Sequence, residues 1–539
     1  MKSIFKFISS RNAAWLFTIF ALACRVSSVL FSSFVHRDKL FLAVQSKSFL
    51  NGNGFVIPKY YTNSINVPIF DLTPNWPPGY PILLAPFLKI FNDDIYLATT
   101  TLDIIAGIFF VLIVRKIVTQ LNFSPVAVNI TTLIVGCFNY QFITQSLPTD
   151  LSSFVFFLLG LSVFLDTIQK DNLELKKILV TALLLWLPCI LRYSYPPLSL
   201  SVFAAVIFVG IYKKKKDLVK KGFIGFGILL CLLFVFFLFL KTTTGDLGYI
   251  VETEKGFYPK QLLDWAPVGP GAFIDPVFVT SQLINFTGIS LIQSLNILAV
   301  INAIMLLGFL FAFFYLFFIK KYFTLINSFK FFILVGFFIS CSTCVSIGYL
   351  TLTYKPQAGW GNYLGELRYF MFVTLYLQII FVGWIFLYSS WKKSLLQKII
   401  VLALSLLMCI EIVHSIYYNI KSASHFEKIK SGDLKDPDYV FFTSMCKELI
   451  SENPDAEILV ASDSDEYFRL MATYLGQKGI YDGFNLLKSL PAVDKKTILI
   501  LALYDNEIAT YQPLLSVQNG KLIKNINHAN FYRIDLLPN

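Results

Sequence analysis

The chain has 539 residues, of which 56% are hydrophobic and only 14% are charged, and its mean hydropathy is +0.66. Because soluble domains carry about a quarter charged residues, this composition excludes a soluble globular protein. The formal net charge is +12, with 32 Lys and Arg against 17 Asp and Glu in residues 1–420 and 13 against 16 in residues 421–539. The basic excess lies among apolar segments, so it indicates membrane orientation and not a nucleic-acid surface.

Apolar segments long enough to cross a bilayer fill the first 420 residues. A helix of about 17–25 apolar residues can span a membrane, and the sequence predicts eleven such spans. They cover residues 12–34, 96–118, 124–145, 150–168, 178–192, 196–212, 222–240, 296–319, 329–352, 367–388 and 398–420. The first follows several basic residues, as a signal peptide would, but it runs on to Val35 and is therefore predicted to remain uncleaved.

The short basic clusters between the spans predict the orientation. If the N-terminus is cytoplasmic, every such cluster falls on the cytoplasmic side, including Arg115-Lys116, Lys213 to Lys216 and Lys392-Lys393. That is the pattern the positive-inside rule requires. We therefore expect a multi-pass protein of a bacterial inner (cytoplasmic) membrane, with loops 35–95 and 241–295 and the tail outside the cytoplasm.

Two domains are predicted, a transmembrane domain over residues 1–420 and an extracytoplasmic domain over residues 421–539. Outer loop 35–95 contains a short helix from Asp38 to Leu50 and an interfacial apolar segment from Tyr80 to Phe91. The tail alternates strand-like runs with a helical stretch near residues 466–475, which is typical of a small α/β domain. The strand-like runs cover residues 457–461, 497–503 and 531–536.

Ionisable residues within or at the edges of spans are candidates for function because burying them in a membrane is costly. In the predicted topology they gather toward the outer face: Arg25, Asp103, Asp150, Arg192 and Arg368. Each also has a structural explanation: an arginine at a helix end can snorkel, Asp150 can cap its helix, and Asp103 can pair with Arg25. Their convergence suits an anionic lipid head group, a channel vestibule or an anion transporter.

Several short motifs combine an arginine in the first span, an acidic residue in the outer loop that follows, and a Pro-Pro segment before an interfacial stretch. The segments are Leu22-Ala23-Cys24-Arg25, Arg37-Asp38-Lys39-Leu40, Asn75-Trp76-Pro77-Pro78-Gly79-Tyr80-Pro81, Leu147-Pro148-Thr149-Asp150, Leu191-Arg192-Tyr193 and Glu366-Leu367-Arg368-Tyr369. They resemble the GT-C superfamily of polytopic glycosyltransferases, especially the bacterial lipid-A aminoarabinose transferase and protein O-mannosyltransferase type, in which the Pro-Pro segment enters an interfacial helix. The resemblance covers about residues 10–200 and thereafter rests on topology and one short motif.

The sequence departs from the family pattern at two places. The family commonly has an acidic pair where this chain has Asp38-Lys39, so a second carboxylate has to come from elsewhere, with Asp71, Asp103 and Asp150 as candidates. A histidine usually precedes the proline pair, and here that residue is Trp76.

The resemblance implies a GT-C-like fold and transfer of a sugar, with inversion, from a polyprenyl-phosphate carrier to an outer-face acceptor that is a lipid, glycan or protein. Asp38 is then the catalytic base, and Arg192 and Arg368 bind the donor phosphate with support from Arg25. Trp76, Pro77 and Pro78 shape the acceptor entrance. The sequence shows no dedicated ligand set for a metal, although it leaves a divalent metal open.

Two other functions remain open at this stage. A transporter or flippase of an anionic lipid-linked compound explains the arginines but not the large outer domain. A membrane scaffold with a partner-binding tail explains the tail but not the charges within the spans.

Overall fold

The computed structural model describes residues 10–30, 37–61, 64–71, 77–138, 148–169, 174–244, 328–353, 370–387, 394–430, 438–462, 478–480, 493, 495–526 and 529–537, and scattered positions between 257 and 307. The chain forms two compact units, one from Met1–Phe31 and Asp103–Ser422 and the other from Ser32–Leu102 and Ala423–Asn539. Residues 35–95, which the sequence predicts as an outer loop of the transmembrane domain, belong to the same unit as the tail.

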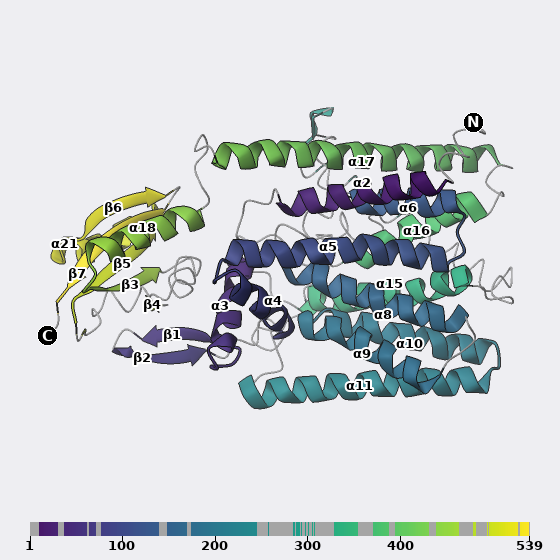
Figure 1. Cartoon of the computed structure of the whole chain (residues 1–539), viewed down its shortest axis with the longest axis horizontal. Helices are drawn as coiled ribbons and strands as arrows, with labels where there is room; N and C mark the ends of the chain where they lie inside the picture. Colours follow the sequence, from purple (N-terminus) through teal and green to yellow (C-terminus); the bar gives the residue numbers. More distant parts are fainter. Residues whose placement is uncertain are drawn as a thin grey trace. The chain divides into compact units, whose positions relative to one another are not determined.

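The first unit is helical, and in Figure 1 the long axes of its helices run in roughly the same direction. The helices are α2 (Arg11–Leu30), α5 (Ile95–Gln120, most of which belongs to this unit), α6 (Pro125–Cys137), α8 (Pro148–Gln169), α9 (Leu175–Leu191), α10 (Tyr195–Tyr212), α11 (Lys216–Thr244), α15 (Ser328–Thr353), α16 (Met371–Leu387) and α17 (Leu395–Lys430). Their packing partners include α8 with α9, α10 with α11 and α2 with α6.

Seven of the helices that the structure describes are long and apolar enough to cross a membrane: α2, α5, α8, α10, α11, α15 and α17. Helices α6 and α16 are apolar but shorter, with 13 and 17 residues. The predicted span 296–319 lies outside the described residues, apart from isolated positions. These helices make the first unit a polytopic membrane body, as the composition predicts.

Aromatic side chains fill much of the interior around α8. The Phe154 ring lies 5.6 Å from that of Phe110 in α5, and the Phe157 ring meets Phe372 of α16 edge-on at 5.4 Å. Edge-to-face and tilted contacts of this kind contribute beyond the buried area alone. Most of α8 is buried, and so is its first turn, where Asp150 lies.

The second unit contains the strands. Its elements are α3 (Arg37–Leu50), β1 (Ile57–Tyr61), β2 (Ser64–Asp71), α4 (Gly79–Ile90), α18 (Asp438–Glu452), β3 (Glu457–Ser462), β4 (Lys478–Ile480), β5 (Thr497–Tyr504), α21 (Ile508–Val517), β6 (Lys521–Ile526) and β7 (Ala529–Leu536). The sheet has the order β2-β1-β4-β3-β5-β7-β6, parallel from β1 to β5 and antiparallel elsewhere.

The sequence predicted strands β3, β5 and β7 and helix α3 close to their observed bounds, and it predicted the helical character of 80–91, which is α4. The predicted helix near 466–475 lies outside the described residues. Strands β1 and β2 were not predicted. The two strands pair with each other, and Tyr60 of β1 pairs with Ile480 of β4, so their place in the sheet depends on a partner far away in the sequence.

The centre of this sheet is apolar on both faces. Seven consecutive residues of β5, from Thr497 to Leu503, are buried, as expected for a strand in the parallel part of a covered sheet. Leu499 and Leu501 pack with Tyr511 and Leu515 of α21. Helix α21 therefore covers one face of β5.

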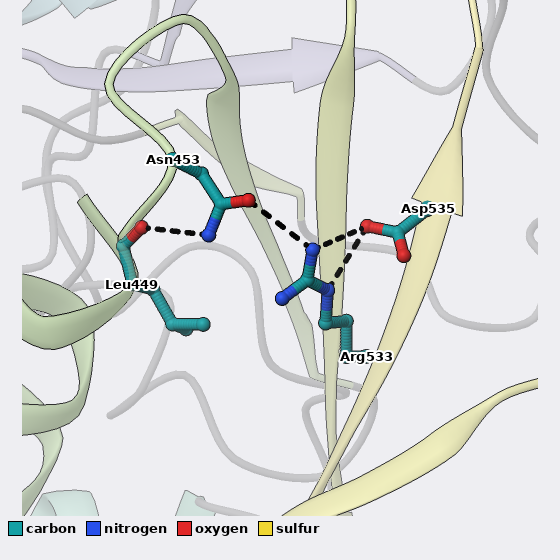
Figure 2. A network of polar contacts seen from close by, with 4 residues as sticks. All are labelled: Leu449, Asn453, Arg533 and Asp535. Atoms are coloured by element: carbon teal, nitrogen blue, oxygen red, sulfur yellow. Dashed lines mark hydrogen bonds and ion pairs between the residues drawn. The ribbon is translucent and has the colours of Figure 1, made fainter. Parts of the chain in front are cut away.

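A small polar network joins the end of α18 to strand β7 (Figure 2). Arg533 donates from Nη2 and Nε to Oδ1 of Asp535, both at 2.9 Å, and from Nη2 to Oδ1 of Asn453 at 3.4 Å. Asn453 in turn donates to the carbonyl oxygen of Leu449 at 3.1 Å. Asn453 directly follows α18, and its backbone N–H also donates to the Leu449 carbonyl oxygen, at 3.0 Å, so the side-chain amide adds a second contact at the end of this helix.

Candidate functional site

Arg25 is buried in α2 and binds the C-terminal end of α6. Its Nη2 donates to the carbonyl oxygens of Val135, Gly136 and Phe138 at 3.2, 3.0 and 2.8 Å. Carbonyls in the last turn of a helix have no intrahelical N–H to bind, and the helix dipole places partial negative charge on them. Arg25 therefore acts as a cationic cap for α6.

Helix α5 supports the same guanidinium from another side. The Arg25 Cζ atom lies 5.6 Å from the centre of the Phe110 ring, and a Cβ added at Gly107 would come within 2.9 Å of the Arg25 Cγ. Asp103 is spaced four residues before Gly107 and seven before Phe110, so it shares the helix face that meets Arg25. Asp103 is itself buried, with 1% of its surface exposed.

Asp150 and Arg192 form a buried ion pair between α8 and α9. Asp150 lies in the first turn of α8, and its Oδ1 contacts Nη1 of Arg192, the residue directly after α9. The side chains are 0% and 8% exposed. A buried charge is tolerated when it is paired. The carboxylate also lies where the positive end of the α8 dipole stabilises it.

The backbone at the end of α9 presents Arg192 to this partner. Arg192 leaves the helix in an extended conformation, with φ −155° and ψ 129°, while its N–H still donates to the Pro188 carbonyl oxygen at 2.9 Å. Its Nε donates to Oγ of Ser194 at 3.2 Å. Two side-chain contacts therefore fix the guanidinium in the short turn between α9 and α10.

The remaining predicted site residues lie in the second unit or outside the described part of the chain. Asp38 is the second residue of α3 and Asp71 is the last residue of β2; nothing is described of either side chain. Trp76 and Arg368 lie outside the described residues. Pro77 and Pro78 are buried just before α4.

Helices α3 and α4 pack on each other within the second unit. Ser46 of α3 donates to the Pro81 carbonyl oxygen at 2.9 Å, and both Ser46 and Tyr80 are 0% exposed. The carbonyl of Pro81 lies in the first turn of α4, so this contact attaches the segment that follows the Pro-Pro pair to the helix that begins with Asp38.

Two features near the predicted site were not recognised as candidates from the sequence. Lys39, noted only as a departure from an acidic pair, is 4% exposed, and burial of a lysine is costly enough to mark a candidate position. Cys24 and Cys137 meet between α2 and α6. Neither feature has a sequence signal, because burial of Lys39 and contact between distant cysteines both depend on the fold. Within the described ranges, no group of three or more His, Cys, Asp or Glu residues could hold a metal ion.

No protein-family model and no curated protein matches the chain, but solved structures do. ArnT from Cupriavidus metallidurans, in a crystal structure with undecaprenyl phosphate bound, matches over 97% of this chain and 98% of its own, with a TM-score of 0.54 and 10% identity. The oligosaccharyltransferase of Archaeoglobus fulgidus, in its apo form, matches over 94% of this chain and 71% of its own, with a TM-score of 0.51 and 11% identity.

Both proteins have the GT-C fold. The likeness shows that this chain has the same fold, which the short motifs of the sequence predict. Together with the seven long apolar helices, it establishes a multi-pass helical membrane protein.

Proposed function

We propose that this protein is a membrane glycosyltransferase that moves a sugar from a polyprenyl-phosphate donor to a lipid, glycan or protein acceptor of the cell envelope. The observation that carries the proposal is the likeness, over nearly the whole chain, to a structure that holds undecaprenyl phosphate. A lipid phosphate has to be bound by cationic groups at the membrane, and two buried arginines, Arg25 and Arg192, belong to the helical unit.

The proposed reaction is a single displacement with inversion. The Asp38 carboxylate takes the proton from the acceptor hydroxyl as the oxygen attacks the anomeric carbon. The bond from that carbon to the carrier phosphate breaks, and its electron pair leaves with the phosphate. Positive charge stabilises this leaving group, for which we assign Arg192 and Arg368. Because the leaving phosphate already has a low pKa, no general acid is required.

The polar contacts support more specific roles for Asp150 and Arg25. Asp150 binds Arg192 directly, so we assign it to orienting the phosphate-binding guanidinium, which leaves Asp71 and Asp103 as candidates for a second carboxylate. Arg25 supports the donor site by holding α2 against α6. Trp76, Pro77 and Pro78 are assigned to the acceptor entrance.

We propose further that the reaction takes place on the outer face of a bacterial inner membrane, with the N-terminus in the cytoplasm and residues 421–539 outside it. The basic clusters at residues 115–116, 213–216 and 392–393 support this orientation. Reporter fusions at residues 216 and 539 test it, since the first should report a cytoplasmic position and the second an extracytoplasmic one.

The decisive experiment measures transfer of a radiolabelled sugar from a panel of polyprenyl-phosphate donors by the purified full-length protein. The wild type is compared with Asp38→Asn, and Asp93→Asn serves as the matched control. Asp93 is a partly exposed residue of the same unit that pairs with Lys47 at 3.0 Å, and asparagine tolerates its positive φ of 64°.

We expect Asp38→Asn to lower the transfer rate by about 10²–10⁴-fold while donor binding persists, and Asp93→Asn to behave as wild type. If the Asp38→Asn variant still transfers sugar at the wild-type rate, Asp38 is not the catalytic base. Saturable binding of the lipid phosphate without turnover of any donor would favour a transporter or flippase. If the protein neither binds the lipid phosphate nor turns over any donor, the result would favour a membrane scaffold.

A further inference from the structure

Two cysteines that are far apart in the sequence meet between α2 and α6. The side chains of Cys24, in α2, and Cys137, the last residue of α6, lie against each other between the two helices. Cys137 is 1% exposed and Cys24 is partly exposed. Both are free thiols. A direct thiol–thiol contact is the starting arrangement that disulfide formation requires, because a disulfide needs Cβ atoms about 3.5–4.5 Å apart.

The two helix backbones approach each other unusually closely beside this pair. A Cβ added at Gly136 would lie 2.3 Å from the Cβ of Ala21 and 3.0 Å from its Cα, so only glycine fits there. Cys24 is three residues after Ala21 and shares its helix face, and Cys137 directly follows Gly136. The Cα atoms of two cysteines joined by a disulfide lie about 4.4–6.8 Å apart, and the close packing of the two backbones here is compatible with such a separation.

Polar contacts on both sides of the pair hold the two helices in register. Arg25, next to Cys24, donates to the carbonyls of residues 135, 136 and 138, which flank Cys137. Asn419 of α17 donates to the Cys24 carbonyl oxygen at 3.3 Å. The backbone on each side of the thiols is therefore already fixed, so joining the two sulfurs requires little backbone movement.

We propose that Cys24 and Cys137 are a modification site that forms a reversible intramolecular disulfide with an oxidant of the disulfide class. One thiol loses its proton, attacks the oxidant and releases half of it as a thiol. The second thiol then loses its proton and displaces the other half. The two cysteines give up two electrons and two protons, and the oxidant becomes two thiols. The product joins α2 to α6 covalently beside the Arg25 cap.

The test uses the full-length purified protein and the membrane-permeant reagent 4,4′-dithiodipyridine, followed by mass spectrometry of a non-reduced digest. In the wild type we expect a linked peptide pair that contains Cys24 and Cys137, lighter by two hydrogens than the sum of the peptides and separated by dithiothreitol. Cys409, which is exposed on α17, is the internal reference and should carry a pyridylthio adduct in every sample that contains it.

The matched variants are Cys24→Ser and Cys137→Ser, with Cys409→Ser as the control. In the first two the linked pair should be absent, and the remaining cysteine should stay unmodified or keep a stable adduct, because no second thiol displaces it. Oxidation should raise the thermal unfolding midpoint of wild type and Cys409→Ser but not that of the other two. Separate adducts or free thiols at Cys24 and Cys137 in wild type, with Cys409 fully converted, would overturn the proposal. The wild-type peptide map decides this even if a serine variant does not fold.

Discussion

The guanidinium of Arg192 and the carboxylate of Asp150 form an ion pair that joins the end of α9 to the first turn of α8. The two charges are almost completely removed from water, so each is stable there mainly because of the other. Since α8 and α9 are consecutive helices that pack together, the pair closes one end of a helical hairpin. Stability and the proposed donor site therefore depend on the same contact.

We expect either Asp150→Asn or Arg192→Gln to lower the free energy of unfolding by about 3–5 kcal/mol, because each leaves an uncompensated buried charge. The double variant should lose much less than the sum of the two. Thermal unfolding in detergent, arranged as a double-mutant cycle, measures the coupling. Asp217→Asn is the control, since Asp217 is 73% exposed in its pair with Lys221 and should cost about 1 kcal/mol or less. If the losses in free energy of unfolding from Asp150→Asn and Arg192→Gln add in the double variant, the buried pairing is contradicted.

The proposed role of Asp150 also predicts a kinetic pattern. Asp150→Glu keeps the charge and should retain more activity than Asp150→Asn, whose loss should lie mainly in KM for the lipid donor. The reason is that a mispositioned Arg192 weakens phosphate binding without removing the base. Initial rates over a range of donor concentrations distinguish these effects. If Asp150→Asn lowers only the fraction of folded protein and leaves KM and kcat of the folded enzyme unchanged, the role of Asp150 is purely structural.

Arg25 should be difficult to replace. Arg25→Met removes three charge-assisted hydrogen bonds to the end of α6, each of a kind that contributes about 1.5–3 kcal/mol when buried; because one amino group makes all three, we expect a total loss of about 3 kcal/mol. Arg25→Lys keeps the charge near the helix end and should lose roughly half as much. The thermal unfolding midpoints of the two variants test the order. Equal midpoints for methionine and lysine would show that the charge does not contribute.

Gly136 should tolerate no side chain, since the methyl group of Gly136→Ala would overlap Ala21. Overpacking of this kind costs about 1–3 kcal/mol, and we expect Ala21→Gly to restore part of the loss in the double variant. The matched control is Gly227→Ala in α11, where a Cβ meets nothing within 4 Å and alanine favours the helix by about 1 kcal/mol. Unfolding measurements on the four variants should therefore show a lower free energy of unfolding for Gly136→Ala and a higher one for Gly227→Ala.

Cys446 in α18 should react slowly. Burial raises the pKa of its thiol from the ordinary 9.0 to about 12, so the nucleophilic thiolate is rarer than in a free thiol by about 10³-fold at pH 8. Iodoacetamide labelling of this residue should be correspondingly slow and increase about tenfold per pH unit up to pH 10. Unfolding in denaturant should remove the difference. Because the folded-state pKa is raised, the stability from this group is complete below pH 9 and is lost between pH 9 and 12.

The sequence was most informative where local composition decides the structure. Apolar length predicted α2, α5, α8, α10, α11 and α15, and alternating or apolar runs predicted β3, β5 and β7, because each pattern is contained within its own segment. The Asp150 and Arg192 candidates came from the cost of charge in a membrane, although their mutual pairing depends on how α8 and α9 pack. The pairing of β1 with β4 and the Cys24–Cys137 contact depend on distant partners and have no local signal.

The pairing of Tyr60 with Ile480 also determines when this sheet can be completed during synthesis. The two residues are 420 positions apart (480 − 60), so at about 5–20 residues per second the ribosome adds β4 roughly 20–80 s after β1. Throughout that interval β1 and β2 can form only a hairpin, and isolated two-stranded hairpins are marginally stable in water. The order of translation therefore makes completion of this sheet one of the last steps in the biogenesis of the protein, after the membrane helices that precede β4 have been synthesised.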